Sequence, residues 1–133
     1  MIFGIGTDIL ELSRVERVWA RFGEHFARRL LLDEEHELFV KSKNPVRFLA
    51  MRFAAKEAIV KAMGTGFAHG VWVRDVGSIP DFRGQPQVIY SARGTAMCER
   101  LGIGTGFVSL TDEAGLILAM AVLMQDDNKR SSR

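Results

Sequence analysis

Three polar side chains stand out in this sequence because their types suit the chemistry of phosphate groups. Asp8 ends an apolar segment, and Glu57 lies in the middle of an Ala-rich one. Taken singly, Asp8 is typical of a turn or helix cap, and Glu57 of an i,i+4 ion pair with Lys61. Taken together, two hard carboxylates with no His or Cys beside them suit Mg²⁺ rather than zinc. The sequence thus raises the hypothesis of a magnesium site.

The residues that follow Glu57 extend this hypothesis. A helix presents positions i, i+4 and i+7 on one side, so Glu57, Lys61 and Gly64 would share a face. Lys61 supplies positive charge, and Gly64-Thr65-Gly66 supplies a loop of small residues. The loop is not a P-loop, because the order G-x-x-x-x-G-K-[ST] is missing. The spacing by itself therefore suggests a phosphate or pyrophosphate site without identifying it.

An Arg-rich segment near the N-terminus forms a second candidate site. Arg14, Arg17 and Arg21 are spaced i, i+3 and i+7, and five arginines stand against two glutamates between Arg14 and Arg29, whereas the whole chain carries +2. Such a run is most often a solvated helix face. It could also bind an acidic protein or a nucleic acid. No aromatic residue is expected among the arginines on that face, which argues against single-stranded nucleic acid.

The composition limits the class of protein. The chain has 133 residues, of which 47% are hydrophobic and 26% charged, as in an ordinary globular domain. The single Cys98 excludes an internal disulfide and a Cys-rich zinc site. The sequence shows neither a signal peptide nor the roughly 20 apolar residues of a membrane span. We expect one domain over residues 1–125, a frayed polar tail over 126–133, no membrane partner and a reducing, cytoplasmic location.

Cap residues and hydrophobic periodicity predict the elements that position these side chains. An apolar strand is expected over Ile2–Ile9. Asn44 before Pro45 predicts the start of a helix that runs to Met63 and ends at Gly64. That helix would be roughly 28 Å long. We therefore expect it to be the centre of the fold.

The other predicted elements are shorter. Ser13 and Glu16 have the spacing of a capping box, which predicts a helix that ends at Gly23. The buried stripe of this helix would be Val15, Val18, Trp19 and Phe22. We also expect helices over Phe26–Leu32, Asp33–Val40 and Ser91–Leu101, and strands over Val71–Val73, Val76–Ile79, Gln87–Tyr90, Phe107–Leu110 and Leu116–Met124. The predicted class is α+β, with a mainly antiparallel sheet packed around one long central helix.

Two segments carry a resemblance to a known family. The segments Gly4–Ile9 (GIGTDI) and Arg52–Gly66 (RFAAKEAIVKAMGTG) resemble the two signatures of the holo-acyl-carrier-protein synthases. These enzymes are the short, bacterial type of 4′-phosphopantetheinyl transferase. The similarity extends through residues 45–50, 84–86 and 108–113. It therefore covers essentially the whole chain up to the tail, and the paired motifs at this separation are specific.

The resemblance implies a reaction and its catalytic residues. It implies Mg²⁺-dependent transfer of 4′-phosphopantetheine from coenzyme A to a serine of apo-acyl carrier protein, with release of adenosine 3′,5′-bisphosphate. Asp8 and Glu57 would bind the metal, and Lys61 would neutralise charge on the pyrophosphate. The serine proton would pass to Glu57 or to a water molecule on the metal, and the sequence does not decide between them.

The resemblance also implies binding roles and an assembly. Gly64, Thr65 and Gly66 would wrap the nucleotide, and Arg52 and Arg47 would face its 3′-phosphate.

The carrier protein would dock its acidic helix on Arg14, Arg17, Arg21 and Arg28. Relatives of this type form trimers with active sites between subunits, so a homotrimer is expected, with no nucleic-acid partner. The alternative from the residues alone is a non-catalytic basic adaptor that binds acidic helical proteins.

Overall fold

The fold is a five-stranded antiparallel sheet with helices on one side of it. A computed structural model describes residues 1–127 of the chain. Its elements are β1 (Ile2–Glu11), α1 (Leu12–Phe22), α2 (Glu24–Leu30), α3 (Asp33–Phe39), α4 (Pro45–Met63), the 3₁₀ turn η1 (Val73–Asp75), β2 (Val76–Pro80), β3 (Pro86–Tyr90), α5 (Ala92–Leu101), β4 (Ile103–Glu113) and β5 (Leu116–Gln125). The strand order is β1-β5-β4-β3-β2, and every neighbouring pair is antiparallel. The predicted α+β class with a central helix is confirmed.

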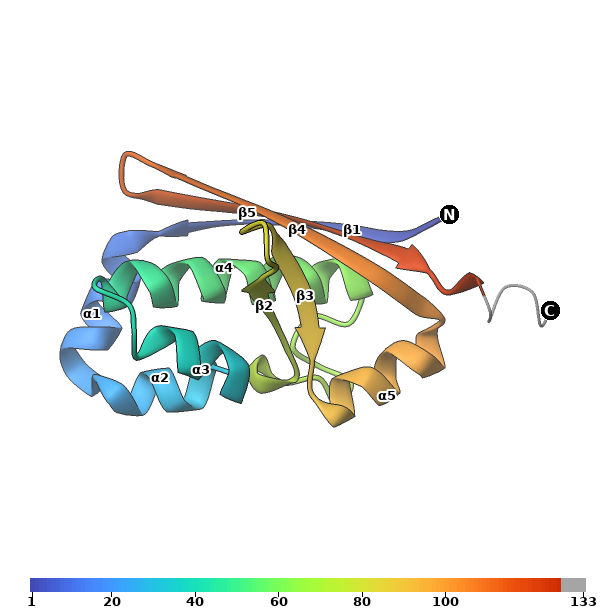
Figure 1. Ribbon diagram of the computed structural model, residues 1–133, viewed down its shortest axis with the longest axis horizontal. Coiled ribbons are helices and arrows are strands. Elements are labelled where there is room, and N and C mark those ends of the chain that lie inside the picture. The colour runs from blue at the N-terminus through green and yellow to red at the C-terminus, as the bar shows by residue number, and fades with distance from the viewer. Residues whose placement is uncertain (128–133) are drawn as a thin grey trace.

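The long helix α4 has the predicted bounds. The Asn44 side chain accepts a hydrogen bond from the backbone N–H of Arg47 at 3.1 Å, and Pro45 occupies the first turn. Gly64 ends the helix with a φ of 81°, a left-handed conformation that favours glycine. In Figure 1, α4 lies between the layer of β1, β4 and β5 on one side and helices α2 and α3 on the other. The fold is built around this helix.

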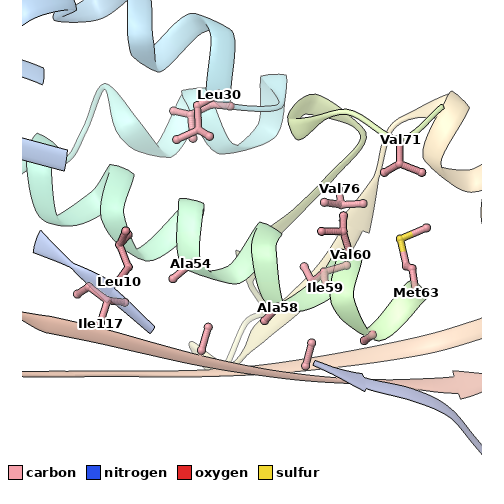
Figure 2. Close-up of a cluster of buried hydrophobic side chains, with 14 of the residues drawn as sticks. Leu10, Leu30, Ala54, Ala58, Ile59, Val60, Met63, Val71, Val76 and Ile117 are labelled. Carbon is pink, nitrogen blue, oxygen red and sulfur yellow. The ribbon is translucent and has the colours of Figure 1, made fainter. Parts of the chain in front are cut away.

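Apolar side chains pack on opposite sides of α4. Figure 2 shows Leu10, Ala58 and Ile117 between α4 and the sheet, with Val60 and Val76 on the other side of the helix. All five are at most 4% exposed. A helix that is apolar around most of its circumference must be covered on several sides. The sheet and the shorter helices together provide this cover.

Two glycines let β1 approach α4 at backbone distance. A Cβ atom on Gly4 would fall on the carbonyl oxygen of Ala62, and one on Gly6 would fall on that of Ala58. The small alanine side chains keep the facing helix surface flat. Any larger residue at Gly6 would push the strand away from the helix. The strand that carries Asp8 is therefore held directly against the helix that carries Glu57.

The predicted capping role of Ser13 is wrong. Helix α1 begins at Leu12, and its cap position is held by Glu11, two residues before Ser13, without a side-chain hydrogen bond. The backbone N–H of Leu12 donates to the carbonyl oxygen of Gly115, in the turn between β4 and β5, at 2.9 Å. A tertiary contact thus replaces the local cap. The predicted end at Gly23 is confirmed.

The strand predicted over Val71–Val73 is also wrong, because a 3₁₀ turn occupies Val73–Asp75. The Asp75 carboxylate accepts hydrogen bonds from the backbone N–H of Trp72 at 2.8 Å and from the Ser91 hydroxyl at 2.7 Å. These bonds hold the chain in a turn at the point where periodicity favours a strand.

The apolar stripe predicted for α1 is only partly buried. Val15 is buried, Val18 and Trp19 are half-buried, and Phe22 is 49% exposed. One side of α1 therefore remains open in the single chain. Among residues 1–127, no helix combines the length and the apolar character needed to span a membrane.

The sheet continues beyond the predicted strands. β4 begins at Ile103 rather than Phe107, and the backbone N–H of Asp126 donates to the carbonyl oxygen of Gly102 at 2.8 Å. The start of the expected tail is thus attached to the fold. The rest of the expected tail, residues 128–133, lies outside the described residues.

Candidate active site

Strand β1 and helix α4 bring Asp8 and Lys61 together. Asp8 lies opposite Ala119 of β5 in the sheet, and its side chain is 15% exposed. The Nζ atom of Lys61 lies 3.5 Å from Oδ1 of Asp8 and donates to the carbonyl oxygen of Thr7 at 3.0 Å. The Lys61 side chain is half-exposed. The sequence placed both residues in the candidate site, and the structure shows that they meet.

Glu57 is in electrostatic contact with the same pair. Partial burial raises the pKa of its carboxyl, the Asp8 carboxylate raises it further, and the charges of Lys61 and Arg14 oppose the shift. The i,i+4 ion pair of Glu57 with Lys61 is not formed: in the described part of the chain, Lys61 pairs with Asp8. Glu57 thus lies within electrostatic range of Asp8 and Lys61, and the two carboxylates repel each other.

This donor set fits Mg²⁺. Oxygen ligands from one or two carboxylates are what Mg²⁺ takes from a protein, with water and phosphate oxygens completing its octahedron. Within residues 1–127, no three His, Cys, Asp or Glu side chains are grouped as metal ligands. A cation held by Asp8 and Glu57 would therefore share its remaining positions with a phosphate ligand and water.

The small-residue loop lies at the C-terminal end of α4. The N–H groups of Thr65 and Gly66 both donate to the carbonyl oxygen of Val60, at 3.3 and 3.1 Å, and that of Gly64 donates to Lys61. These N–H groups close the helix and do not point outward as a phosphate cradle would. The loop would therefore contact a nucleotide through its side-chain and carbonyl groups or by van der Waals packing.

Arg52 does not lie beside Asp8 in the single chain. Its Nε atom is 3.8 Å from Oε2 of Glu35, and its guanidinium lies over the ring of Phe48, with Cζ 4.3 Å from the ring centroid. Burial lowers the pKa of Arg52, and the charge of Glu35 opposes this shift. Its Nε has no hydrogen-bond partner among the described residues. Arg52 thus lies with α3 rather than with the Asp8 cluster.

Arg47 is also separated from Asp8. It lies ten residues before Glu57, about 15 Å along the helix axis. Its guanidinium binds the carboxylate of Asp112 in two bonds, at 2.9 and 3.1 Å. This pair lowers the pKa of Asp112 and raises that of Arg47. Arg47 therefore connects the start of α4 to the end of β4.

The arginines of α1 border an apolar groove. Exposed Arg14, Arg17 and Arg21 line a cavity of about 340 Å³ together with Phe22 and Phe26. The expectation that no aromatic residue lies among these arginines is therefore wrong, since Phe22 lines the same groove. Such a surface combines apolar contact area with positive charge, which suits an amphipathic acidic helix.

Residue patterns missed a buried ion pair between α4 and α3. Lys56 and Glu35 are both fully buried, with Nζ of Lys56 2.8 Å from Oε1 of Glu35. Nζ also donates to the carbonyl oxygen of Val76, and Oε2 of Glu35 accepts from the N–H of Ser78. The sequence does contain a hint of this pair. Lys56 lies one turn after Arg52 on an Ala-rich helix, and a lysine buried on such a helix requires an acidic partner.

Comparisons with known proteins show the family to which the chain belongs. A model of the 4′-phosphopantetheinyl transferase superfamily matches residues 4–119. The holo-[acyl-carrier-protein] synthase of Nitrosospira multiformis is 44% identical over 123 residues, which are 92% of this chain and 98% of the relative. The chain belongs to the holo-[acyl-carrier-protein] synthases of this superfamily. Family membership confirms the prediction of an enzyme and disfavours the non-catalytic adaptor.

Solved structures of the family share the fold. The crystal structure of holo-[acyl-carrier-protein] synthase from Neisseria meningitidis has a TM-score of 0.88 and 42% identity, covering 94% of this chain and all of that one. The synthase of Bacillus anthracis, in complex with CoA (3′,5′-ADP), has a TM-score of 0.76 and 33% identity, covering 94% and 98% of the two chains. The family fold therefore extends over nearly the whole of this chain.

Proposed function

We propose that the chain transfers 4′-phosphopantetheine from coenzyme A to a serine of apo-acyl carrier protein in a Mg²⁺-dependent reaction. The convergence of Asp8, Glu57 and Lys61 carries this proposal. The serine oxygen bonds to the β-phosphorus of coenzyme A, and the bond from that phosphorus to the bridging oxygen breaks. The serine proton is removed, and adenosine 3′,5′-bisphosphate leaves with the bridging oxygen.

Asp8, Glu57 and Lys61 would have different roles in the reaction. Asp8 and Glu57 would hold the Mg²⁺ ion, which supplies positive charge to the diphosphate when bound. Lys61 adds a second positive charge on the same side of α4 and stabilises the negative charge that develops on the leaving oxygen. Glu57 would also lie within the site as an acceptor of the serine proton, either directly or through a water molecule.

The binding site for the nucleotide would be completed by a second copy of the chain. Gly64, Thr65 and Gly66 lie three to five residues beyond Lys61, past the end of α4, whereas Arg47 and Arg52 pair with Asp112 and Glu35 of the same chain. Both arginines would therefore contact the 3′-phosphate of a nucleotide that is bound between two subunits.

An exposed apolar face supports self-association, which we propose is trimeric. Ile5 and Ile9 of β1 are about 60% exposed, and Leu118 and Met120 of the neighbouring β5 are more than 40% exposed, as is Phe107 of β4. These residues alternate with buried ones along their strands, so they share the outer side of the sheet. A contiguous apolar face of this kind marks an interface.

The carrier protein would bind along α1. Arg14 lies close enough to Glu57 to affect its pKa, so the basic groove begins beside the catalytic residues. Arg17 and Arg21 continue it along α1, and Arg28 lines an adjoining groove that shares Phe26 and Phe53 with it. A partner helix with acidic side chains would thus present its serine next to the site. A cytoplasmic location is part of this proposal.

The test measures the mass of apo-acyl carrier protein after incubation with coenzyme A, with and without Mg²⁺. We expect a mass increase of one phosphopantetheine group that needs Mg²⁺ and is lost in Asp8→Asn and Glu57→Gln. Glu99→Gln, an exposed carboxylate on α5, is the matched control and should retain activity. Thermal shifts with coenzyme A, with and without Mg²⁺, report binding separately from transfer. Unchanged transfer in either site variant would overturn the metal assignment.

A further inference from the structure

A second basic groove lies next to the groove of α1. Its volume is about 530 Å³, and Arg28, Arg29, Arg74, Arg93 and the ring of Trp72 line it. Phe26 and Phe53 line both grooves, so the two surfaces are continuous. Of its four arginines, only Arg28 has a part in the docking proposed above, and we call this second groove the distal groove.

The distal groove has a marked positive charge. Four arginines line it, and no acidic side chain is among its lining residues in the described part of the chain. Asp33 and Asp75 each pair with one of these arginines from outside the groove, at 3.3 and 3.0 Å. Arg28 and Arg29 add two exposed charges on α2. A positive field of this kind attracts an acidic partner.

Two of the arginines are held in place. The Nε–H group of Arg93 donates to Oδ2 of Asp75 at 3.0 Å, and that of Arg74 donates to the carbonyl oxygen of Leu31 at 3.0 Å. Both side chains are nevertheless more than half exposed. A guanidinium fixed at Nε loses less conformational entropy when its terminal N–H groups bind a carboxylate.

An exposed aromatic ring completes the surface. Trp72 is 61% exposed, and its backbone N–H donates to the Asp75 carboxylate that also holds Arg93. One buried carboxylate therefore fixes both the ring's backbone and a neighbouring cation. Tryptophan and arginine are the residue types most enriched at the energetic centres of interfaces.

We propose that the distal groove binds a second acidic segment of the carrier protein, in addition to the helix that docks on α1. This inference rests on the proposed function. Continuity with the α1 groove places the occupant in the same partner, and the four arginines require it to be acidic. The exposed ring of Trp72 would cover an apolar side chain of that segment. The distal groove thus affects which carrier proteins bind, whereas Asp8, Glu57 and Lys61 carry out the transfer.

The test is a kinetic comparison of Arg74→Gln/Arg93→Gln with the parent enzyme, using apo-acyl carrier protein as the varied substrate. Loss of two rim charges should raise KM for the carrier protein by roughly tenfold, with kcat and KM for coenzyme A unchanged. The dependence of kcat/KM on salt should become shallower, because fewer charges attract the partner. Trp72→Ala should raise the same KM without altering the salt dependence.

Matched controls separate this inference from charge in general and from the proposed function. Arg100→Gln removes one charge from the same helix as Arg93 and lies outside both grooves, so it is compared with Arg93→Gln alone. Melting temperatures check that the variants remain folded. Absence of transfer by the parent enzyme would overturn the proposed function. Normal transfer with unchanged KM and salt dependence in the double variant would overturn only the distal groove.

Discussion

Lys61 joins the two elements of the site, because its Nζ atom donates to the Thr7 carbonyl at 3.0 Å and lies 3.5 Å from the Asp8 carboxylate. One lysine of α4 thus contacts both the backbone and the side chain of β1. Its half-exposed position leaves donors that a phosphate can reach. The relation between Lys61 and Asp8 is therefore both a structural contact and the start of a ligand site.

Replacing Lys61 tests its electrostatic role. Lys61→Ala should lower kcat by about 10²–10³, the usual effect of removing one group that stabilises developing charge. Lys61→Arg should retain more activity, because it keeps the charge with altered geometry. Steady-state kinetics measure both variants, and urea unfolding checks their folding. A kcat for Lys61→Ala equal to that of the parent enzyme would exclude this role.

The raised pKa of Glu57 predicts a pH dependence. Protons compete with Mg²⁺ for the carboxylate, so Mg²⁺ affinity should fall as pH drops through a pKa above the ordinary 4.5. In the metal-free protein the sign is opposite: the folded state binds the Glu57 proton more tightly than the unfolded state, so this residue's contribution to stability increases as pH falls through the same range. Calorimetric titration with Mg²⁺ and urea unfolding at several pH values measure the two effects. In Glu57→Gln, the pH dependence of Mg²⁺ affinity and this residue's contribution to the pH dependence of stability should both disappear. A pH profile unchanged by that substitution would contradict the role of Glu57 as a metal ligand.

Gly6 should tolerate no side chain. The Cβ of Gly6→Ala would overlap the carbonyl oxygen of Ala58, so β1 must move away from α4. We expect a loss of about 3 kcal/mol in the free energy of unfolding and weaker Mg²⁺-dependent binding of coenzyme A. Thr95→Ala, at an exposed position on α5, is the control and should change stability little. Wild-type stability and coenzyme A binding in Gly6→Ala would show that the close contact is not required.

The buried pair of Lys56 and Glu35 should be sensitive to loss of one partner. Lys56→Met leaves a carboxylate buried against Gly77, and we expect it to destabilise the fold by about 3–5 kcal/mol. Glu35→Gln/Lys56→Met should cost less than the sum of the single changes. Urea unfolding measures the cycle. Asp112→Asn, which breaks the exposed pair with Arg47, should cost only a small fraction of that loss. Additive losses from the two buried substitutions would show that the partners act independently.

The outer face of the sheet should determine the oligomeric state. Ile9→Glu places a charge in the middle of the apolar face and should shift a trimer toward monomers. Light scattering coupled to size-exclusion chromatography measures the molar mass. Phe82→Glu changes an apolar side chain that is 95% exposed in the turn between β2 and β3, and it should leave the assembly intact. A monomeric parent protein would overturn the trimer proposal.

The amino-acid pattern by itself determined the long helix and the candidate site residues. Asn44, Pro45 and Gly64 carry local chemistry that begins and ends a helix almost regardless of context, so α4 has the predicted bounds. Spacing along that helix was enough to place Glu57 and Lys61 on one side. These are short-range relations, and a sequence contains them directly.

Only the tertiary structure decided what these residues contact. Asp8 and Lys61 are 53 positions apart, and they meet because Gly6 lets a strand lie against a helix. The same long-range packing replaced the cap expected at Ser13 and directed Arg52 toward Glu35, away from the site. Such contacts depend on the register and the distance of two elements that are remote in the chain, which local propensity and periodicity do not encode.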